Sequence, residues 1–384
     1  MRTYRKQLTA AGGVLAIVLA VMACSSSNAS SGSTTGGLPS TIKLNAVQDL
    51  TGVAGTQGSD TQAGMQVAVD QINATGFLGT SKLSISYADD DSTATNGASL
   101  MSQAAAGSAP IVFGSISSAV AVAEAPIAQR DKAPTIFTQA GSAGVISAGD
   151  YIYRATPLQT TYLHLTGQYI QQHGYKRLGM ITVTDVPTIV SIAAYFQQNA
   201  AKYGYSIVDE EQTTSAATVF SSQVTKVLSK KPDAVLVLGL SGQNPVAVSQ
   251  MRSAGYSGPI IGQQGMGGGV LKPLGKSADG IFWATDFAAS QSGPGAQKFV
   301  QAYAKYGRGT PSNFSAEGYD AVWLAARALK DAGSVDRAKV LASLVKVADA
   351  GFEGALGSVK FVDRSEIAPG VLVQWSGGKE VAAP

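Results

Sequence analysis

Short apolar runs alternate with longer segments of helical spacing along most of the chain. The clearest example lies between residues 110 and 144, where apolar runs at 110–113 and 134–137 flank a segment of helical composition at 118–130. Short continuous apolar runs of this kind are typical of strands that are covered on both faces. We therefore expect a strand–helix–strand unit here, with a Gly/Ser-rich turn after each strand.

The same alternation continues on both sides of this unit. Further strands are predicted at 41–47, 83–87, 151–157, 177–183, 205–210, 233–238, 259–262, 280–285, 358–361 and 371–375. Further helices are predicted from about 60 to Gly76, from about 94 onward, and at about 160–173, 188–203, 217–229, 245–254, 296–306, 315–332 and 337–347. Strands that alternate with helices imply parallel sheets, so the sequence predicts an α/β fold.

The length and order of these elements predict two lobes. About 340 residues follow the N-terminal segment, which exceeds the usual size of a single hydrophobic core. We expect the chain to cross between the lobes near Thr156, near Thr285 and again near the C-terminus, which would make a hinge beside a binding cleft. The first lobe would comprise residues 41–155 and about 286–350, and the second lobe residues 156–285 and about 351–384.

The N-terminal residues are typical of an exported protein. Three basic residues precede an apolar run from about 10 to 23, which is too short for a comfortable membrane span and is typical of a secretion signal. Residues 21–23 resemble the start of a bacterial lipobox that ends at Cys24. We expect residues 1–23 to be a signal peptide and Cys24 to carry the lipid. The alternative is an ordinary signal peptide with an incidental cysteine.

A low-complexity segment rich in Ser, Gly and Thr continues to residue 40, and its composition is typical of a flexible tether. Residues 24–40 are therefore expected to hold the protein near the outer face of the cytoplasmic membrane of a bacterium. The membrane would be a partner only through the lipid anchor.

Charge and residue counts exclude several classes of function. The net charge of +3 comes from Arg2, Arg5 and Lys6, so the chain after the signal peptide is neutral. Bulk charge therefore gives no reason to expect a nucleic-acid partner. Cys24 is the single cysteine, which excludes an internal disulfide. His164 and His173 are nine positions apart on one predicted helix and do not share a face. We expect no metal, no cofactor and a monomer.

Neutral polar residues follow the two strands of the strand–helix–strand unit. Ligands of parallel sheets bind where the carboxyl ends of the strands meet. The residues at these two ends are Ser115, Ser117, Ser118, Thr138, Gln139 and Ser142. They contain no acid–base pair, and no G-x-S-x-G elbow with a nearby histidine suggests a hydrolase. These ends are expected to bind a small molecule, although serines here would also suit helix caps.

Several short motifs in their order resemble one family. The motifs include residues 42–47 (Ile-Lys-Leu-Asn-Ala-Val), 68–73, 87–91 and 318–322, and the resemblance covers residues 41–376. The chain resembles the Leu/Ile/Val-binding family of ABC-transporter substrate-binding proteins. This resemblance implies the type I periplasmic-binding fold, in which two Rossmann-like lobes joined by three crossovers close on a ligand. It also implies a permease and ATPase subunits as partners. An extracytoplasmic sensor with the same fold is the alternative.

The resemblance also implies a set of ligand contacts. Ser118 corresponds to a serine that holds the ligand carboxylate, and the turn at 139–142 corresponds to the second contact loop. Gln264 stands where amino-acid binders carry an acid that pairs with the ligand ammonium. The full set of positions is Gln57, Ser118, Gln139, Ala140, Ser142, Thr188, Ser241, Gln264 and Phe314.

The departures from the family pattern bear on the ligand. Gln264 keeps an acceptor but removes the negative charge, and a buried ammonium without a carboxylate partner is costly. Gln57, Thr188 and Ser241 replace residues that are often aromatic. A cleft of this kind would suit amides, urea-like compounds, polyols or a carboxylate that lacks an amine.

Overall fold

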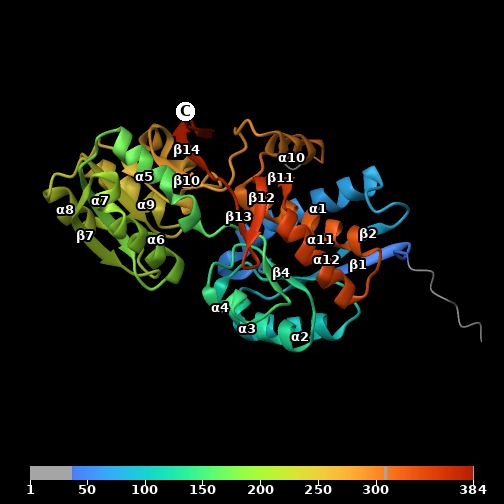
Figure 1. Ribbon diagram of the computed structural model, residues 1–384. Helices are drawn as coiled ribbons and strands as arrows, with labels where there is room; N and C mark the ends of the chain where they lie inside the picture. The colour runs from blue at the N-terminus through green and yellow to red at the C-terminus, as the bar shows by residue number, and fades with distance from the viewer. Residues whose placement is uncertain (1–36, 307–308, 384) are drawn as a thin grey trace, which may run out of the picture. The chain divides into compact units, whose positions relative to one another are not determined.

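Two β-sheets organise the protein, whose computed structural model describes residues 37–306 and 309–383 (Figure 1). Within these residues, one sheet has eight strands in the order β11-β12-β13-β5-β4-β3-β1-β2. Strands β1 to β5 pair in parallel, and β11 to β13 form an antiparallel extension. The strands are β1 (Thr41–Gln48), β2 (Lys82–Asp89), β3 (Val112–Gly114), β4 (Thr135–Phe137), β5 (Ile152–Arg154), β11 (Phe352–Gly354), β12 (Gly357–Val362) and β13 (Ser365–Ile367).

The second sheet has seven strands among the described residues, in the order β15-β14-β10-β9-β8-β6-β7. Strands β6 to β10 pair in parallel, whereas β14 and β15 are antiparallel. The strands are β6 (Arg177–Val183), β7 (Ser206–Thr213), β8 (Ala234–Leu238), β9 (Ile260–Ile261), β10 (Phe282–Thr285), β14 (Val371–Ser376) and β15 (Lys379–Ala382). The predicted α/β class with two mainly parallel sheets is confirmed.

Helices cover both faces of each sheet, which is why inner parallel strands such as β8 are continuously apolar. On the eight-stranded sheet, one face packs against α1, α10, α11 and α12 and the other against α2, α3 and α4. On the seven-stranded sheet, α5, α6 and α7 cover one face and α8 and α9 the other (Figure 1). The helices are α1 (Gly55–Thr75), α2 (Ala94–Ala106), α3 (Ser118–Arg130), α4 (Ala143–Ile146), α5 (Leu163–Gln172), α6 (Pro187–Gln198), α7 (Ala200–Tyr203), α8 (Ser221–Ser229), α9 (Asn244–Ser253), α10 (Pro294–Lys305), α11 (Asn313–Ala332) and α12 (Arg337–Ala350).

Four short 3₁₀ turns complete the described elements. They are η1 (Gly52–Ala54), η2 (Gln159–Thr161), η3 (Gln264–Met266) and η4 (Lys272–Ala278). Helix α1 ends at Gly76 in the left-handed conformation, with φ at 63°, which is the helix stop that the sequence predicts at this glycine. No helix in the described part of the chain is both long enough and apolar enough to span a membrane.

The described chain passes between the two sheets three times. These crossings follow β5, β10 and β13, so they leave the first sheet after Arg154, return to it after Thr285, and leave it again after Ile367. The last crossing differs from the prediction, which assigned residues from about 351 onward to the second lobe. Residues 352–367 belong to the first sheet instead, because β13 pairs in parallel with β5 through Ser365 and Arg154.

Candidate ligand-binding site

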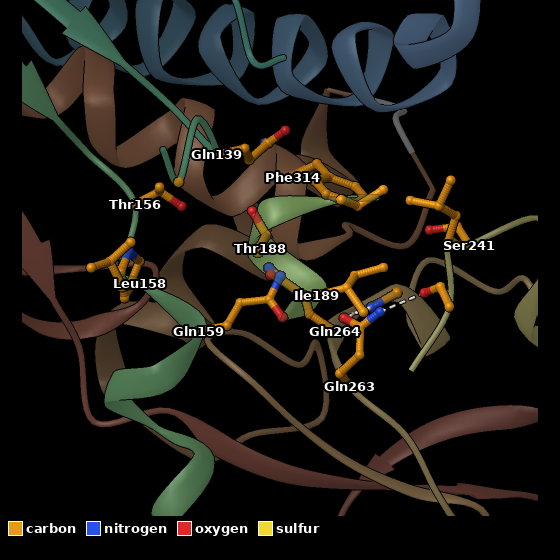
Figure 2. Close-up of a pocket in the computed structure, with 16 residues that line it drawn as sticks. Gln139, Thr156, Leu158, Gln159, Thr188, Ile189, Ser241, Gln263, Gln264 and Phe314 are labelled. Carbon is orange, nitrogen blue, oxygen red and sulfur yellow. Dashed lines mark hydrogen bonds between the residues drawn. The ribbon is translucent and has the colours of Figure 1, made fainter. Parts of the chain in front are cut away.

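A cavity of about 230 Å³ lies where the carboxyl ends of strands from both sheets meet. Gln139 and Gly141 follow β4, residues 156–159 follow β5, and Phe314 is in the first turn of α11. The second sheet contributes the turns after β6, β8 and β9. In Figure 2, the lining side chains converge from these separate turns. The second-sheet lining consists of Val186, Thr188, Ile189, Gly239, Leu240, Ser241, Gln263, Gln264 and Gly265.

The lining is neutral throughout the residues that the structure describes. Hydroxyl and amide groups come from side chains such as Gln139, Gln159 and Thr188, and apolar surface comes from side chains such as Ile189 and Phe314 (Figure 2). Such a cavity can orient a small molecule through a few hydrogen bonds while burying its apolar part. It offers no side-chain charge to neutralise a charged group on the ligand.

The turn after β4 is held in place by α1. Gln139 adopts a positive φ of 57°, which is uncommon for a residue with a side chain. Its Nε2 donates to Thr61 Oγ1 (3.0 Å), and Thr61 Oγ1 donates to the carbonyl of Gln57 (3.0 Å). Gln57, which the resemblance places beside the ligand, does not line the cavity. Since α1 begins at Gly55, Gln57 lies inside a helix and supports Gln139 through its backbone.

Ser118, Ala140 and Ser142 lie beside the cavity without lining it. Ser118 begins α3, and its Oγ accepts a hydrogen bond from the backbone N–H of Ser142 (3.2 Å). This bond joins the turns after β3 and β4. Ala140 is fully buried, and its carbonyl accepts from Arg154 Nη1 (3.2 Å). These residues position the turn that carries Gln139.

A second cavity of about 450 Å³ adjoins the first and shares Gly141, Leu158, Gln159 and Thr188 with it. Ser142 and Arg154 line this extension. Arg154 is almost fully buried, and it donates to the carbonyls of Ala140 and Ser142 (3.2 and 3.3 Å) and to Ser365 Oγ (2.8 Å). Burial lowers the pKa of Arg154 to about 10, so it stays cationic at neutral pH.

The structure brings five of the nine expected residues to the lining of the first cavity. These are Gln139, Thr188, Ser241, Gln264 and Phe314. Ser142 lines the extension, whereas Gln57, Ser118 and Ala140 line neither cavity. Direct ligand contact stays a prediction for all nine. Cys24 lies outside the described residues.

Gln264 does not offer the free acceptor that the sequence suggests. Its Oε1 accepts from Tyr162 Oη (3.2 Å), and its Nε2 donates to Asp286 Oδ1 (3.1 Å) and Glu317 Oε1 (3.2 Å). The amide therefore faces two carboxyl groups behind the cavity. The preceding residue, Gln263, is held within its own lobe, because it donates to the carbonyl of Gly239 (2.7 Å) and accepts from Gly265 N (2.8 Å) (Figure 2).

The two carboxyl partners of Gln264 were not expected from the sequence. Asp286 and Glu317 are both fully buried, and desolvation raises the pKa of each. The hydroxyl of Thr156, which lines the cavity, acts to lower the pKa of Glu317, but desolvation outweighs it. No local sequence motif could identify this pair, because the two acids are far apart in the sequence: Asp286 follows β10, and Glu317 lies in α11. Within the described residues, no group of His, Cys, Asp and Glu side chains is arranged to hold a metal ion.

The sequence model of the family described as periplasmic binding protein matches residues 41–379. The chain belongs to this family. Periplasmic binding proteins bind solutes and are not enzymes, which agrees with a cavity lined by neutral side chains.

Individual relatives support the same assignment. The chain is 26% identical to Leu/Ile/Val-binding protein homolog 8 of Brucella abortus (strain 2308), over 88% of this chain and 89% of that protein. Its fold is similar to that of the branched-chain amino acid transporter substrate binding protein LivJ from Streptococcus pneumoniae in complex with isoleucine, with a TM-score of 0.79, 25% identity, and coverage of 89% of this chain and 99% of that one. The expected resemblance to the Leu/Ile/Val-binding family is confirmed.

A further solved periplasmic binding protein holds a different ligand. It is an ABC-transporter solute binding protein from R. palustris in complex with benzoate, with a TM-score of 0.78, 22% identity, and coverage of 89% of this chain and 95% of that chain. At this level of identity, the likeness concerns the fold alone.

Proposed function

We propose that the chain is the extracytoplasmic substrate-binding lipoprotein of an ABC importer. It captures a small polar ligand in the cavity between the two sheets by closure at the hinge, and it delivers the ligand to a permease with ATPase subunits. The main support is the cavity itself, which is lined by the carboxyl ends of strands from both sheets in a member of a binding-protein family.

The ligand that this cleft suits best is a carboxylate without an ammonium group. Among the described residues that line the two adjoining cavities, Arg154 is the only charged one. It supports the Gln139–Ser142 turn from behind, so it contributes positive potential there. On the opposite side, the Gln264 amide is already bonded to Tyr162, Asp286 and Glu317. An ammonium group would thus meet no free carboxylate.

A panel of matched compounds tests this assignment. Each small carboxylate is compared with its 2-amino acid and its amide, as in 4-methylpentanoate, leucine and 4-methylpentanamide. A compound that binds only the folded protein at 100 times its Kd stabilises it by about 2.7 kcal/mol. We expect thermal shifts from carboxylates and smaller shifts from the matching amino acids. Tight calorimetric binding of leucine would contradict the ligand class, and a panel without any shift would contradict the binding function.

Replacement of Phe314 by Ala provides a matched test of the site. Phe314 lines the cavity, so the variant should bind the best compound of the panel at least tenfold more weakly. The control is Val345→Ala, which changes a residue on the exposed side of α12 and should leave the affinity unchanged. Equal affinities of the two variants would place the ligand elsewhere.

Two further experiments test the anchor and the importer role. Cys24→Ser should move the protein from the membrane fraction to the soluble fraction, and mass spectrometry should find the lipid on Cys24 of the natural chain only. Loss of ligand uptake on deletion supports the importer. Uptake that persists, together with the loss of a transcriptional response to the ligand, would favour a sensor.

A further inference from the structure

Three buried carboxyl groups lie where the three crossings of the described chain meet. Asp286 directly follows β10 at the second crossing, and Glu366 lies in β13 just before the third. Glu317 is on α11, where the hydroxyl of Thr156 from the first crossing acts on its pKa. Asp286, Glu317 and Glu366, which we call the hinge acids, are each at most 1% exposed.

The hinge acids have no cationic partner within the described residues. The charged groups around them are Asp320, one turn further along α11, and Arg327, which acts on Asp320. Tyr162 faces Asp286 and Glu317 from the start of α5. Arg154 lies on the neighbouring strand β5, where its guanidinium is bonded to Ser365 and two carbonyls rather than to a carboxylate.

Protonation of the hinge acids would remove the cost of burying three carboxylate charges without a cationic partner. Both oxygens of Glu366 are buried and accept no hydrogen bond from any described residue, and the same holds for Asp286 Oδ2 and Glu317 Oε2. An ionised carboxyl group in such a place carries a large desolvation cost, whereas a protonated one does not. A proton on Glu317 also lets this residue donate to Asp286, with which it is paired.

Gln264 connects these acids to the opposite lobe. It sits in the turn after β9 of the seven-stranded sheet, and it donates to Glu317 of α11, which packs on the eight-stranded sheet. Separation of the lobes would break this bond. It would also remove the Gln264 amide that lies between the cavity and the carboxyl groups of Asp286 and Glu317, so that water could reach these two groups and stabilise their ionised form.

We propose that Gln264 and the hinge acids form a proton-linked latch, in which lobe closure takes up protons and lobe opening releases them. This inference rests on the proposed hinge closure, and it adds a pH control to that function. Desolvation raises the pKa of all three hinge acids in the arrangement described here. Protonation therefore favours the arrangement in which Gln264 joins the two lobes, so closure is favoured at low pH and weakened as the pH rises.

The experiment measures the distance between spin labels on the two lobes of the ligand-free protein. The mature chain carries Cys24→Ser to remove its natural thiol. The labels are placed at Gln103→Cys on α2 and Ser222→Cys on α8, which are exposed positions of the two lobes. Distance distributions are compared at pH 5.5 and pH 8.5. We expect a shift to longer distances at the higher pH.

Matched variants decide whether the hinge acids cause this shift. Glu317→Gln and, independently, Glu366→Gln keep the shape of the side chain and remove the titration, so each should reduce the shift. Circular dichroism confirms that each variant is folded. Identical distributions at both pH values, or an undiminished shift in both folded variants, would overturn the latch. Because no ligand is present, this outcome is separate from the outcome of the compound panel.

Discussion

Two clusters of buried acids in this protein differ in what holds them. Among the hinge acids, Asp286 and Glu317 accept hydrogen bonds from side chains, and their shared donor, Gln264, lies in the turn after β9 of the seven-stranded sheet. Glu366 accepts none from the described residues. The second cluster consists of Asp49, Asp90 and Glu124 near the start of α3, and we call these residues the α3 acids. They are also fully buried.

The α3 acids accept mainly from backbone N–H groups of their own lobe. Asp49 Oδ2 accepts from Ile116 N (2.9 Å) and Ser117 N (3.2 Å) and from the hydroxyl of Ser115. Glu124 Oε2 accepts from Ser115 N (2.9 Å) and Asp90 Oδ1 from Ser92 N (2.8 Å). Since donors and acceptors move together, hinge motion leaves these bonds intact. Buried acids whose hydrogen-bond donors lie in the same lobe therefore stabilise that lobe. Buried acids with a donor in the opposite lobe respond to the relative position of the two lobes.

The largest expected effect is at Asp49. Asp49→Ala leaves the Ser115 hydroxyl and the amides of Ile116 and Ser117 without their acceptor. We expect the free energy of unfolding to fall by about 3 kcal/mol in urea denaturation. The spin-label distances between the lobes should be the same in the folded Asp49→Ala variant as in the natural chain. Asp331→Ala removes an exposed ion pair with Lys346 and serves as the control, with a loss below about 1 kcal/mol.

The next effect separates two neighbouring glutamines. Gln264→Ala removes the donor to Asp286 and Glu317, and we expect a loss of about 2 kcal/mol that grows with pH, because ionised acids need donors more than protonated ones. Gln263→Ala removes bonds to Gly239 and Gly265 within one lobe. Its cost should be the same at pH 5.5 and pH 8.5. If the loss in the free energy of unfolding changes with pH in the same way for both variants, the hinge acids do not differ from groups held within one lobe.

A third prediction concerns the pH dependence of stability. Desolvation raises the pKa of Glu366, so the folded protein binds this proton more tightly than the unfolded chain does. The contribution of Glu366 to the free energy of unfolding is present at low pH. It is lost as the pH rises above the pKa of a glutamate in the unfolded chain, by at most about 1.4 kcal/mol per pH unit. Glu366→Gln should flatten this part of the profile. An unchanged slope would mean that Glu366 is ionised in the folded protein.

The α3 acids provide the comparison for that profile. Desolvation, followed by repulsion from Asp49, raises the pKa of Asp90 to about 6 from its usual 3.8. Asp90→Asn should therefore flatten the profile only between about pH 4 and pH 6. If the difference in the free energy of unfolding between the variant and the natural chain continues to grow above about pH 6, another group is responsible for it.

The smallest effect is expected at Ser118. Ser118→Ala removes the acceptor of the Ser142 N–H, a partly buried bond, so the loss should be about 1 kcal/mol or less. Its pH dependence should be absent. A larger loss would mean that the bond between the two strand-end turns stabilises the first lobe more than a single hydrogen bond does.

The alternation of apolar runs with helical segments predicted most of the fold, because inner parallel strands such as β8 are covered on both faces and are apolar throughout. The strands that it missed are short and mixed in polarity. β11 reads Phe-Glu-Gly and β13 reads Ser-Glu-Ile, and both lie in the antiparallel extension of the first sheet. β15 reads Lys-Glu-Val-Ala and lies at the antiparallel edge of the second sheet. Such strands are defined by their pairing partners. The partner of β13, strand β5, lies more than two hundred residues away and is not visible in a local window.

The candidate site was predictable to the extent that it depends on strand ends. Gln139, Thr188, Ser241, Gln264 and Phe314 reach the cavity because their turns follow strands or begin helices of known order. The orientation of Gln264 was not predictable, since it depends on the tertiary burial of Asp286 and Glu317. The family resemblance placed Gln57 beside the ligand, whereas α1 begins at Gly55 and includes this residue.

The late crossing after β13 has a consequence for how the protein is made. The first sheet needs residues 352–367 for β11 to β13, and the second needs residues 371–382 for β14 and β15, which place the fully buried Trp375 in its core. The first lobe can therefore complete its sheet only after residue 367 has been synthesised, and the second only after residue 382. Nascent chains should remain sensitive to proteases until the last strands emerge, and both lobes should then become resistant together.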